Sequence, residues 1–190
     1  MGAKVVVVGA SLGGLRALQM LLGGLPKDFP APVVVVQHRH VSSEAVFSRL
    51  LQTCSALPVC EATDKIGLAP GQVYIAPPDY HLLVDSHGLA LSTEGPVNHS
   101  RPSIDVLFES ASYAFGASVI GVILTGSTGD GARGAALIEA RGGVVLVQDP
   151  ATAESGAMPA AAIAATSVHK VLPLSEIAPL LIELCRAKGS

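Results

Sequence analysis

The chain has 190 residues, which suits one domain with its own core, and we expect residues 1–190 to form a single unit. Its net charge of -3, the absence of tryptophan and the lack of a basic run argue against nucleic-acid binding. No apolar run approaches the roughly 20 residues that span a bilayer, and the run after Lys4 is too short for a secretory signal. We therefore expect a cytoplasmic protein that does not insert into membranes.

Cysteine and histidine usage argues against a metal site. The cysteines are odd in number and lack metal-ligand spacing, which predicts reduced thiols at Cys54, Cys60 and Cys185. Four histidines also lack metal-ligand spacing, and we assign them no role: His81, His87, His99 and His169. We expect neither a metal nor a cofactor.

The predicted elements alternate between strand and helix. Short apolar runs rich in β-branched residues predict buried parallel strands at 5–8, 33–36, 119–124 and 144–147. Helical spacing of apolar residues predicts helices at 15–22, 45–51, 104–114 and 132–140. This alternation predicts an α/β fold with a doubly wound, mainly parallel sheet flanked by helices.

Two regions depart from this alternation of strand and helix. Short strands at 73–76 and 81–84, split by Pro77 and Pro78, and a further strand after Gly88 predict an antiparallel hairpin insertion. Near the end of the chain, 160–165 reads as a helix that starts around Met158 and Pro159. The stretch 175–187 predicts a closing helix whose regular part follows Pro179.

Ligands of open α/β sheets bind beyond the carboxyl ends of the strands, so the residues that follow the apolar runs are the candidate site. Ser11 follows the first run in a glycine-bounded turn, His38 follows the second, and Asp130 lies in a glycine-rich loop after a later one. A serine hydroxyl becomes a nucleophile when an imidazole takes its proton and a buried carboxylate orients that imidazole. The backbone N–H of Leu12 could stabilise an oxyanion, a contribution of about 3 kcal/mol per donor.

Each of these residues has an alternative reading. Ser11 could instead cap a helix. His40 is a rival base, and Asp149 is a rival acid. Asp130 could bind backbone amides in its own loop.

Two other families with a glycine turn fit less well. A dinucleotide site is disfavoured because serine stands where its fingerprint needs glycine, and the second strand ends without an acidic residue. The order serine, histidine, acid also differs from that of the α/β-hydrolases.

The ordered motifs resemble the catalytic domain of the chemotaxis protein-glutamate methylesterases of the CheB family. The resemblance covers nearly the whole chain and rests on the turn 9–14, the strand end 36–38 and the segment 121–132. Further matches are 74–82, 101–108, 148–149 and 156–159. The resemblance selects Asp130 over Asp149 and His38 over His40.

The resemblance implies hydrolysis of glutamyl methyl esters by a Ser11, His38 and Asp130 triad, with glutaminyl deamidation as a further activity to test. Its implied partners are the methylated cytoplasmic helices of chemoreceptors or a similar signalling protein. The family commonly carries an N-terminal receiver domain, whereas ten residues precede Ser11 here. We therefore expect a chain without a receiver domain, with any phosphorylation control acting through a separate receiver protein.

The sequence departs from the usual family pattern at four places, one of which is the pair Arg39-His40, where a short residue pair ending in proline is usual. Leu12 stands where threonine is usual, Ser127 where methionine is usual, and Ser100 where a histidine often precedes the Arg-Pro-Ser motif. The resemblance places these positions at the substrate end of the site, so they bear on substrate preference and rate. The alternatives are a CheB-like binding or signalling module without catalysis, and an esterase for a substrate other than a receptor.

Overall fold

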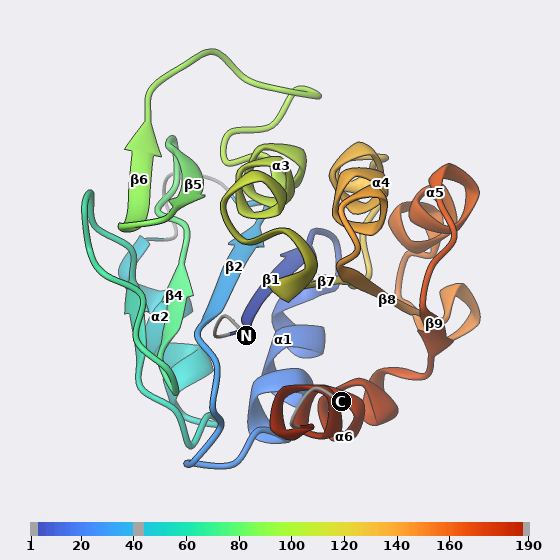
Figure 1. The fold of residues 1–190 in the computed structure, drawn as a ribbon, viewed down its shortest axis with the longest axis horizontal. Helices are drawn as coiled ribbons and strands as arrows, with labels where there is room; N and C mark the ends of the chain where they lie inside the picture. The colour runs from blue at the N-terminus through green and yellow to red at the C-terminus, as the bar shows by residue number, and fades with distance from the viewer. Residues whose placement is uncertain (1–3, 40–43, 188–190) are drawn as a thin grey trace.

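A parallel sheet forms the centre of the molecule (Figure 1), which is described by a computed structural model over residues 4–39 and 44–187. Seven strands pair in the order β3-β4-β2-β1-β7-β8-β9, and every pair is parallel. The strands are β1 (Val5–Ala10), β2 (Val33–Gln37), β3 (Val59–Glu61), β4 (Val73–Ile75), β7 (Val119–Ile123), β8 (Val144–Gln148) and β9 (Lys170–Leu172). The predicted doubly wound α/β fold is confirmed.

Helices cover both faces of the sheet. One face carries α1 (Gly14–Gly23), α2 (Glu44–Gln52) and α6 (Leu174–Arg186), and the other carries α3 (Ile104–Phe115), α4 (Ala132–Ala140) and α5 (Ala157–Ala165). Alternate valines of β1 separate between the two cores: Val6 and Val8 pack with α1 and α6, while Val5 and Val7 pack with α3 and α4. A strand buried on both faces needs apolar residues at every position, which explains the unbroken valine runs.

The predicted hairpin insertion is confirmed, but one strand assigned to it was wrong. The hairpin is made by β5 (His81–Asp85) and β6 (Gly88–Ser92), which pair antiparallel beside α3. The segment at 73–75 instead forms β4, which lies between β2 and β3 in the main sheet. Its fully buried residues satisfy their backbone groups in the parallel ladder before Pro77 and Pro78 end the strand.

The closing helix is confirmed, but its regular part begins earlier than predicted. It runs from Leu174 through Pro179 to Arg186 without interruption. Pro179 lies inside the helix, as the sixth of its thirteen residues, so its missing N–H removes one hydrogen bond from the helix interior. Burial of Ile177 and Leu181 against the sheet supplies the stability that the intrinsic propensity lacks.

The strand order fixes where a ligand can bind. The chain leaves β1 for β2 on one side and later returns to β7 on the other, so the winding direction reverses around β1. The carboxyl ends of these three strands therefore border the point at which doubly wound folds form their sites. In the described part of the chain, no helix is long and apolar enough to cross a membrane.

We predict that Phe108→Ala lowers the free energy of unfolding by about 3–5 kcal/mol, because Phe108 is fully buried and its removal leaves a cavity. Val46→Ala, at a position that is 62% exposed, should change that free energy by less than about 0.5 kcal/mol. Urea denaturation of both variants measures the difference. A Phe108→Ala protein as stable as the wild type would contradict this packing.

Candidate active site

The Ser11 turn is held by its backbone on both sides. The Ser11 N–H donates to the Thr125 carbonyl over 3.0 Å, and the Ser11 carbonyl accepts from the Gly14 N–H over 2.8 Å. Gly13 has a φ of +79° and occupies the cap position of α1 without a side-chain cap hydrogen bond. The alternative reading of Ser11 as a helix cap is therefore wrong, because its hydroxyl caps no backbone N–H.

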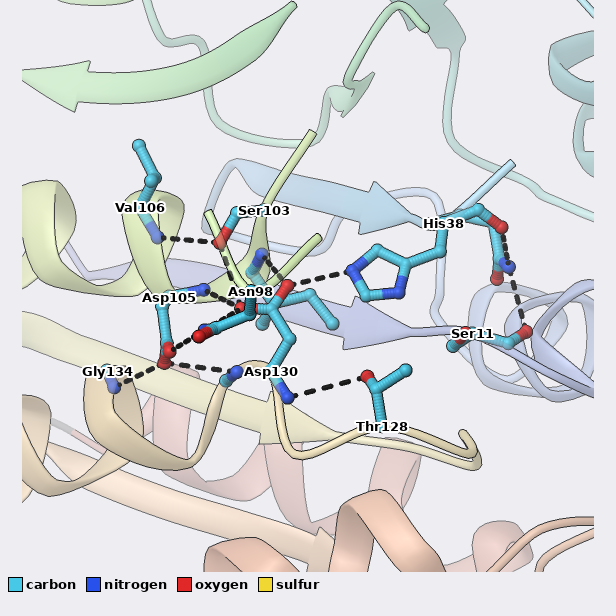
Figure 2. A network of polar contacts seen from close by, with 12 residues as sticks. Ser11, His38, Asn98, Ser103, Asp105, Val106, Thr128, Asp130 and Gly134 are labelled. Atoms are coloured by element: carbon cyan, nitrogen blue, oxygen red, sulfur yellow. Dashed lines mark hydrogen bonds and ion pairs between the residues drawn. The ribbon is translucent and has the colours of Figure 1, made fainter. Parts of the chain in front are cut away.

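His38 contacts the predicted acid directly. Its N–H extends the β1–β2 ladder by donating to the Ala10 carbonyl, and its Nε2 lies 2.8 Å from Oδ2 of Asp130. A carboxylate accepts from an N–H, so this contact favours the tautomer with its proton on Nε2 and a free lone pair on Nδ1. In the view of Figure 2, the ring lies between Asp130 and Ser11.

The nitrogen used here differs from the familiar serine-protease arrangement, in which the acid holds Nδ1. Within the described residues no hydrogen bond joins the Ser11 hydroxyl to the imidazole of His38. Catalytic hydrogen bonds are often long before substrate binds and tighten in the complex. Ser11 therefore lies on the turn beside His38. The Nε2 of His38 is already bound to Asp130, which leaves Nδ1 as the nitrogen that can act as the base.

Asp130 is almost completely buried and accepts hydrogen bonds at both carboxylate oxygens (Figure 2). Two donors are the first N–H groups of α3, whose N-terminus favours a negative charge. The donors to Oδ1 are Ser103 Oγ at 2.8 Å, Asp105 N at 3.1 Å and Asn98 Nδ2 at 3.2 Å, and Ile104 N joins His38 at Oδ2 over 2.7 Å.

The same contacts keep Asp130 ionised. Burial by itself raises the pKa of the Asp130 carboxyl, but the hydrogen bonds from His38, the α3 N–H groups and the Ser103 hydroxyl outweigh it. The net result is a pKa below the ordinary value, because these donors stabilise the charged form.

A second buried carboxylate supports the first. Oδ1 of Asp105 accepts from the N–H groups of Gly131 and Gly134 at 3.0 and 2.7 Å, and Oδ2 accepts from the Asn98 amide at 2.7 Å. Asn98 therefore bridges Asp105 and Asp130. Burial raises the pKa of Asp105, and the nearby charge of Asp130 raises it further, while the Gly134 N–H opposes the shift.

The candidate residues predicted from sequence did not include Asn98, Ser103 or Asp105. Ser103 carries a detectable signal, since a serine before a helical apolar pattern predicts an N-cap, and it does cap α3. Asn98 lies in a loop with a φ of +50° and gives no such signal. Its contact with two carboxylates arises only from the tertiary fold.

Ser103 and His81 form another buried pair near Asp130, with a different geometry. His81 Nδ1 accepts from the Ser103 backbone N–H at 3.2 Å, whereas the Ser103 hydroxyl donates directly to Asp130. Ser103 and His81 are 0% and 1% exposed. A buried hydroxyl that is bound to the carboxylate itself supports the acid and is not presented to a substrate.

An open hollow of about 630 Å³ lies over the Ser11 turn. Leu12 and Ser127 line it together with Ser11 and His38, as the resemblance leads us to expect, and Leu12 is 54% exposed. Ser100 is not among the lining residues, contrary to the expectation from the resemblance, and its backbone pairs with that of Val97. The predicted oxyanion donor, the Leu12 N–H, has no acceptor in the described part of the protein.

The rival acid does not join this site. The Asp149 carboxylate accepts from the Ala151 N–H at 2.9 Å and caps a short 3-10 helix. His40 lies outside the described residues. In residues 4–39 and 44–187, no group of three His, Cys, Asp or Glu side chains could hold a metal ion, and the cysteines are free.

We predict that Asp130→Asn lowers the free energy of unfolding by about 3 kcal/mol at neutral pH, because buried donors lose a charged acceptor. A carboxyl whose folded pKa is depressed stabilises the fold above its unfolded pKa of about 3.9, and this is lost as pH falls through the folded pKa. The difference between wild type and variant should therefore shrink below about pH 3.9.

Denaturant titrations across this range test the prediction, with Asp28→Asn as the control because the Asp28 side chain is 76% exposed. A difference for Asp130→Asn that grows as pH falls would contradict the assignment of a depressed pKa.

Known proteins match this chain over nearly its whole length. The family model for CheB methylesterase matches residues 6–181. The crystal structure of the Thermotoga maritima CheB methylesterase catalytic domain matches with a TM-score of 0.94 at 38% identity, covering 97% of this chain and 100% of that one.

Curated relatives agree. A Leptospira interrogans protein, named provisionally as a protein-glutamate methylesterase/protein-glutamine glutaminase, is 45% identical over 97% of this chain and 96% of its own length. An Anaeromyxobacter dehalogenans protein-glutamate methylesterase/protein-glutamine glutaminase is 45% identical over 96% of this chain, which spans 54% of that relative. The chain belongs to the CheB methylesterase family.

Proposed function

We propose that this protein is a protein-glutamate methylesterase in which Ser11 is the nucleophile, His38 the base and Asp130 the residue that orients the base. The observation that carries the proposal is the 2.8 Å contact between His38 Nε2 and the buried Asp130 carboxylate beside the Ser11 turn. Family membership supports the same reaction.

In the first half of the reaction, Nδ1 of His38 takes the Ser11 proton while Oγ attacks the ester carbonyl carbon. The Leu12 N–H faces the charge that develops on the carbonyl oxygen of the tetrahedral intermediate. The intermediate collapses as the bond to the methoxy oxygen breaks, and imidazolium gives its proton to the departing methanol. The products are methanol and a glutamyl ester of Ser11.

In the second half, His38 takes a proton from water while the water oxygen attacks the acyl carbon. Collapse of the second intermediate breaks the bond to Ser11 Oγ, which regains its proton from His38. Asp130 stays ionised throughout, since its hydrogen bonds hold its pKa low, and it stabilises the imidazolium in both halves.

The same steps with ammonia as the leaving group deamidate glutamine, and the names of the relatives support this second reaction. We propose the methylated cytoplasmic helices of chemoreceptors as the substrate, which Leu12 and Ser127 would contact in the hollow. We further propose that residues 1–190 act as one catalytic domain.

Ser11→Ala should lower methanol release from a methylated receptor by about four orders of magnitude or more, because members of such triads act as a unit. Ser127→Ala is the matched control, since it removes a hydroxyl from the same hollow without touching the triad. Its rate should stay within about tenfold of wild type. Methanol release that survives Ser11→Ala would remove the proposed nucleophile.

Ser103→Ala tests the other buried serine. It removes one of the hydrogen bonds that keep Asp130 ionised, worth about 1.5–3 kcal/mol, so kcat should fall by up to about 10- to 100-fold, the limit reached if the whole contribution is lost in the transition state. A serine-directed phosphonate should still label Ser11 in this variant, as read by peptide mass spectrometry. Loss of all labelling, in a folded protein, would point to Ser103 as the reacting serine instead.

A further inference from the structure

Gln37, the last residue of β2, connects the two reacting side chains through their backbones. Its Nε2 donates to the Ser11 carbonyl and to the His38 carbonyl, each over 2.8 Å. We infer that Gln37 is a positioning residue that sets the spacing between the Ser11 turn and the His38 imidazole. This inference rests on the proposed function, because it concerns the roles of those two residues.

The orientation of the amide is fixed by its neighbours. Two carbonyl oxygens face one end of the Gln37 amide, so that end must be the NH₂ group. The other end of the amide, Oε1, has no hydrogen-bond partner in the described residues. It is also shielded from water, because Gln37 is only 6% exposed. An unpaired buried acceptor is unfavourable, and this amide bears that cost while both its protons go to Ser11 and His38.

The start of α1 holds the amide from the other side. A β-carbon on Gly14 would lie 1.8 Å from Gln37 Oε1, so the amide oxygen fills the space that any larger residue would need. Gln37 also lines the hollow over Ser11. The amide is therefore confined between the first residue of α1 and the end of the sheet.

The backbone alone does not fix the spacing between Ser11 and His38. The last ladder bond between the two strands runs from the His38 N–H to the Ala10 carbonyl, and Ser11 itself is tied to Thr125 on the opposite side. Beyond that bond, among the described residues, the Gln37 amide is the hydrogen-bonded link between the Ser11 and His38 backbones. Small displacements of reacting groups have large kinetic effects, about 100-fold for 1 Å.

Loss of this amide should cost little stability. The Ser11 carbonyl keeps the Gly14 N–H as a donor. The His38 carbonyl loses the donor that it has among the described residues, but replacing Gln37 by methionine also removes the unpaired Oε1, which offsets part of that loss. If Gln37 served only to satisfy these backbone carbonyls, its replacement would lower the stability of the fold and leave kcat unchanged.

The chain offers a matched control at the opposite end of the sheet. Gln72 Nε2 also bridges two backbone carbonyls, those of Pro58 and Val73, at 3.0 and 3.2 Å. Gln72 lies beside β3 and β4 and does not line the hollow. Gln72→Met therefore removes the same kind of bridge without touching the site.

The experiment compares Gln37→Met, Gln37→Glu and Gln72→Met with the wild type. The readouts are kcat and KM for methanol release, the rate of phosphonate labelling at Ser11 and the thermal midpoint. Gln37→Met should lower kcat and the labelling rate by about 10- to 100-fold, with KM within about twofold and only a small change in midpoint. Gln72→Met should leave kcat and labelling unchanged.

Gln37→Glu separates the shape of the side chain from its donors. It has nearly the same size, but an ionised carboxylate cannot donate, whereas a protonated one regains a single donor. Its kcat should be low at neutral pH and should rise relative to wild type as pH falls. The thermal midpoint of Gln37→Glu over the same pH range separates this from a purely structural role, in which kcat and the midpoint would recover together.

The outcomes separate the two proposals. A wild-type protein that neither releases methanol nor is labelled at Ser11 would overturn the proposed function, and the role of Gln37 with it. A labelled wild type together with a folded Gln37→Met of unchanged kcat and labelling rate would overturn only the role of Gln37. An equal loss in Gln72→Met would do the same.

Discussion

The hydrogen bond between His38 Nε2 and the buried Asp130 carboxylate is the contact on which the geometry of the site depends. It joins the end of β2 to the loop after β7, two strands that flank β1 in the sheet. The carboxylate can stay ionised in this buried position because α3 begins against it and Ser103 and Asn98 donate to it. The N-terminus of one helix therefore sets the orientation of an imidazole on the neighbouring strand.

The serine side of the site is held by different means. Ser11 receives its position from backbone bonds to Thr125 and Gly14, and among the described residues its hydroxyl, which lines the hollow, makes no hydrogen bond. The Gln37 amide joins this turn to the histidine strand. In the proposed mechanism, the base, His38, is held in a fixed position. The backbone of the nucleophile, Ser11, is also fixed, but its hydroxyl can adjust to the substrate.

The parts that sequence predicted are those governed by local patterns. Unbroken apolar runs predicted the buried strands, and two of the candidate residues that follow these runs, His38 and Asp130, lie in contact. The position of Val73–Ile75 in the main sheet was not predicted, because a three-residue strand next to Pro77 gives no pairing signal. The support from Asn98 and Asp105 was missed for a related reason: it depends on contacts between distant segments.

The most direct test of the central claim is a crystal structure of the protein after reaction with a serine-directed phosphonate. The account predicts a covalent bond from phosphorus to Ser11 Oγ, with His38 Nδ1 toward that oxygen and Nε2 still bound to Asp130. A phosphonyl oxygen should lie within hydrogen-bond distance of the Leu12 N–H. Phosphorus bound to Ser103, or an imidazole that holds Asp130 through Nδ1, would contradict the account.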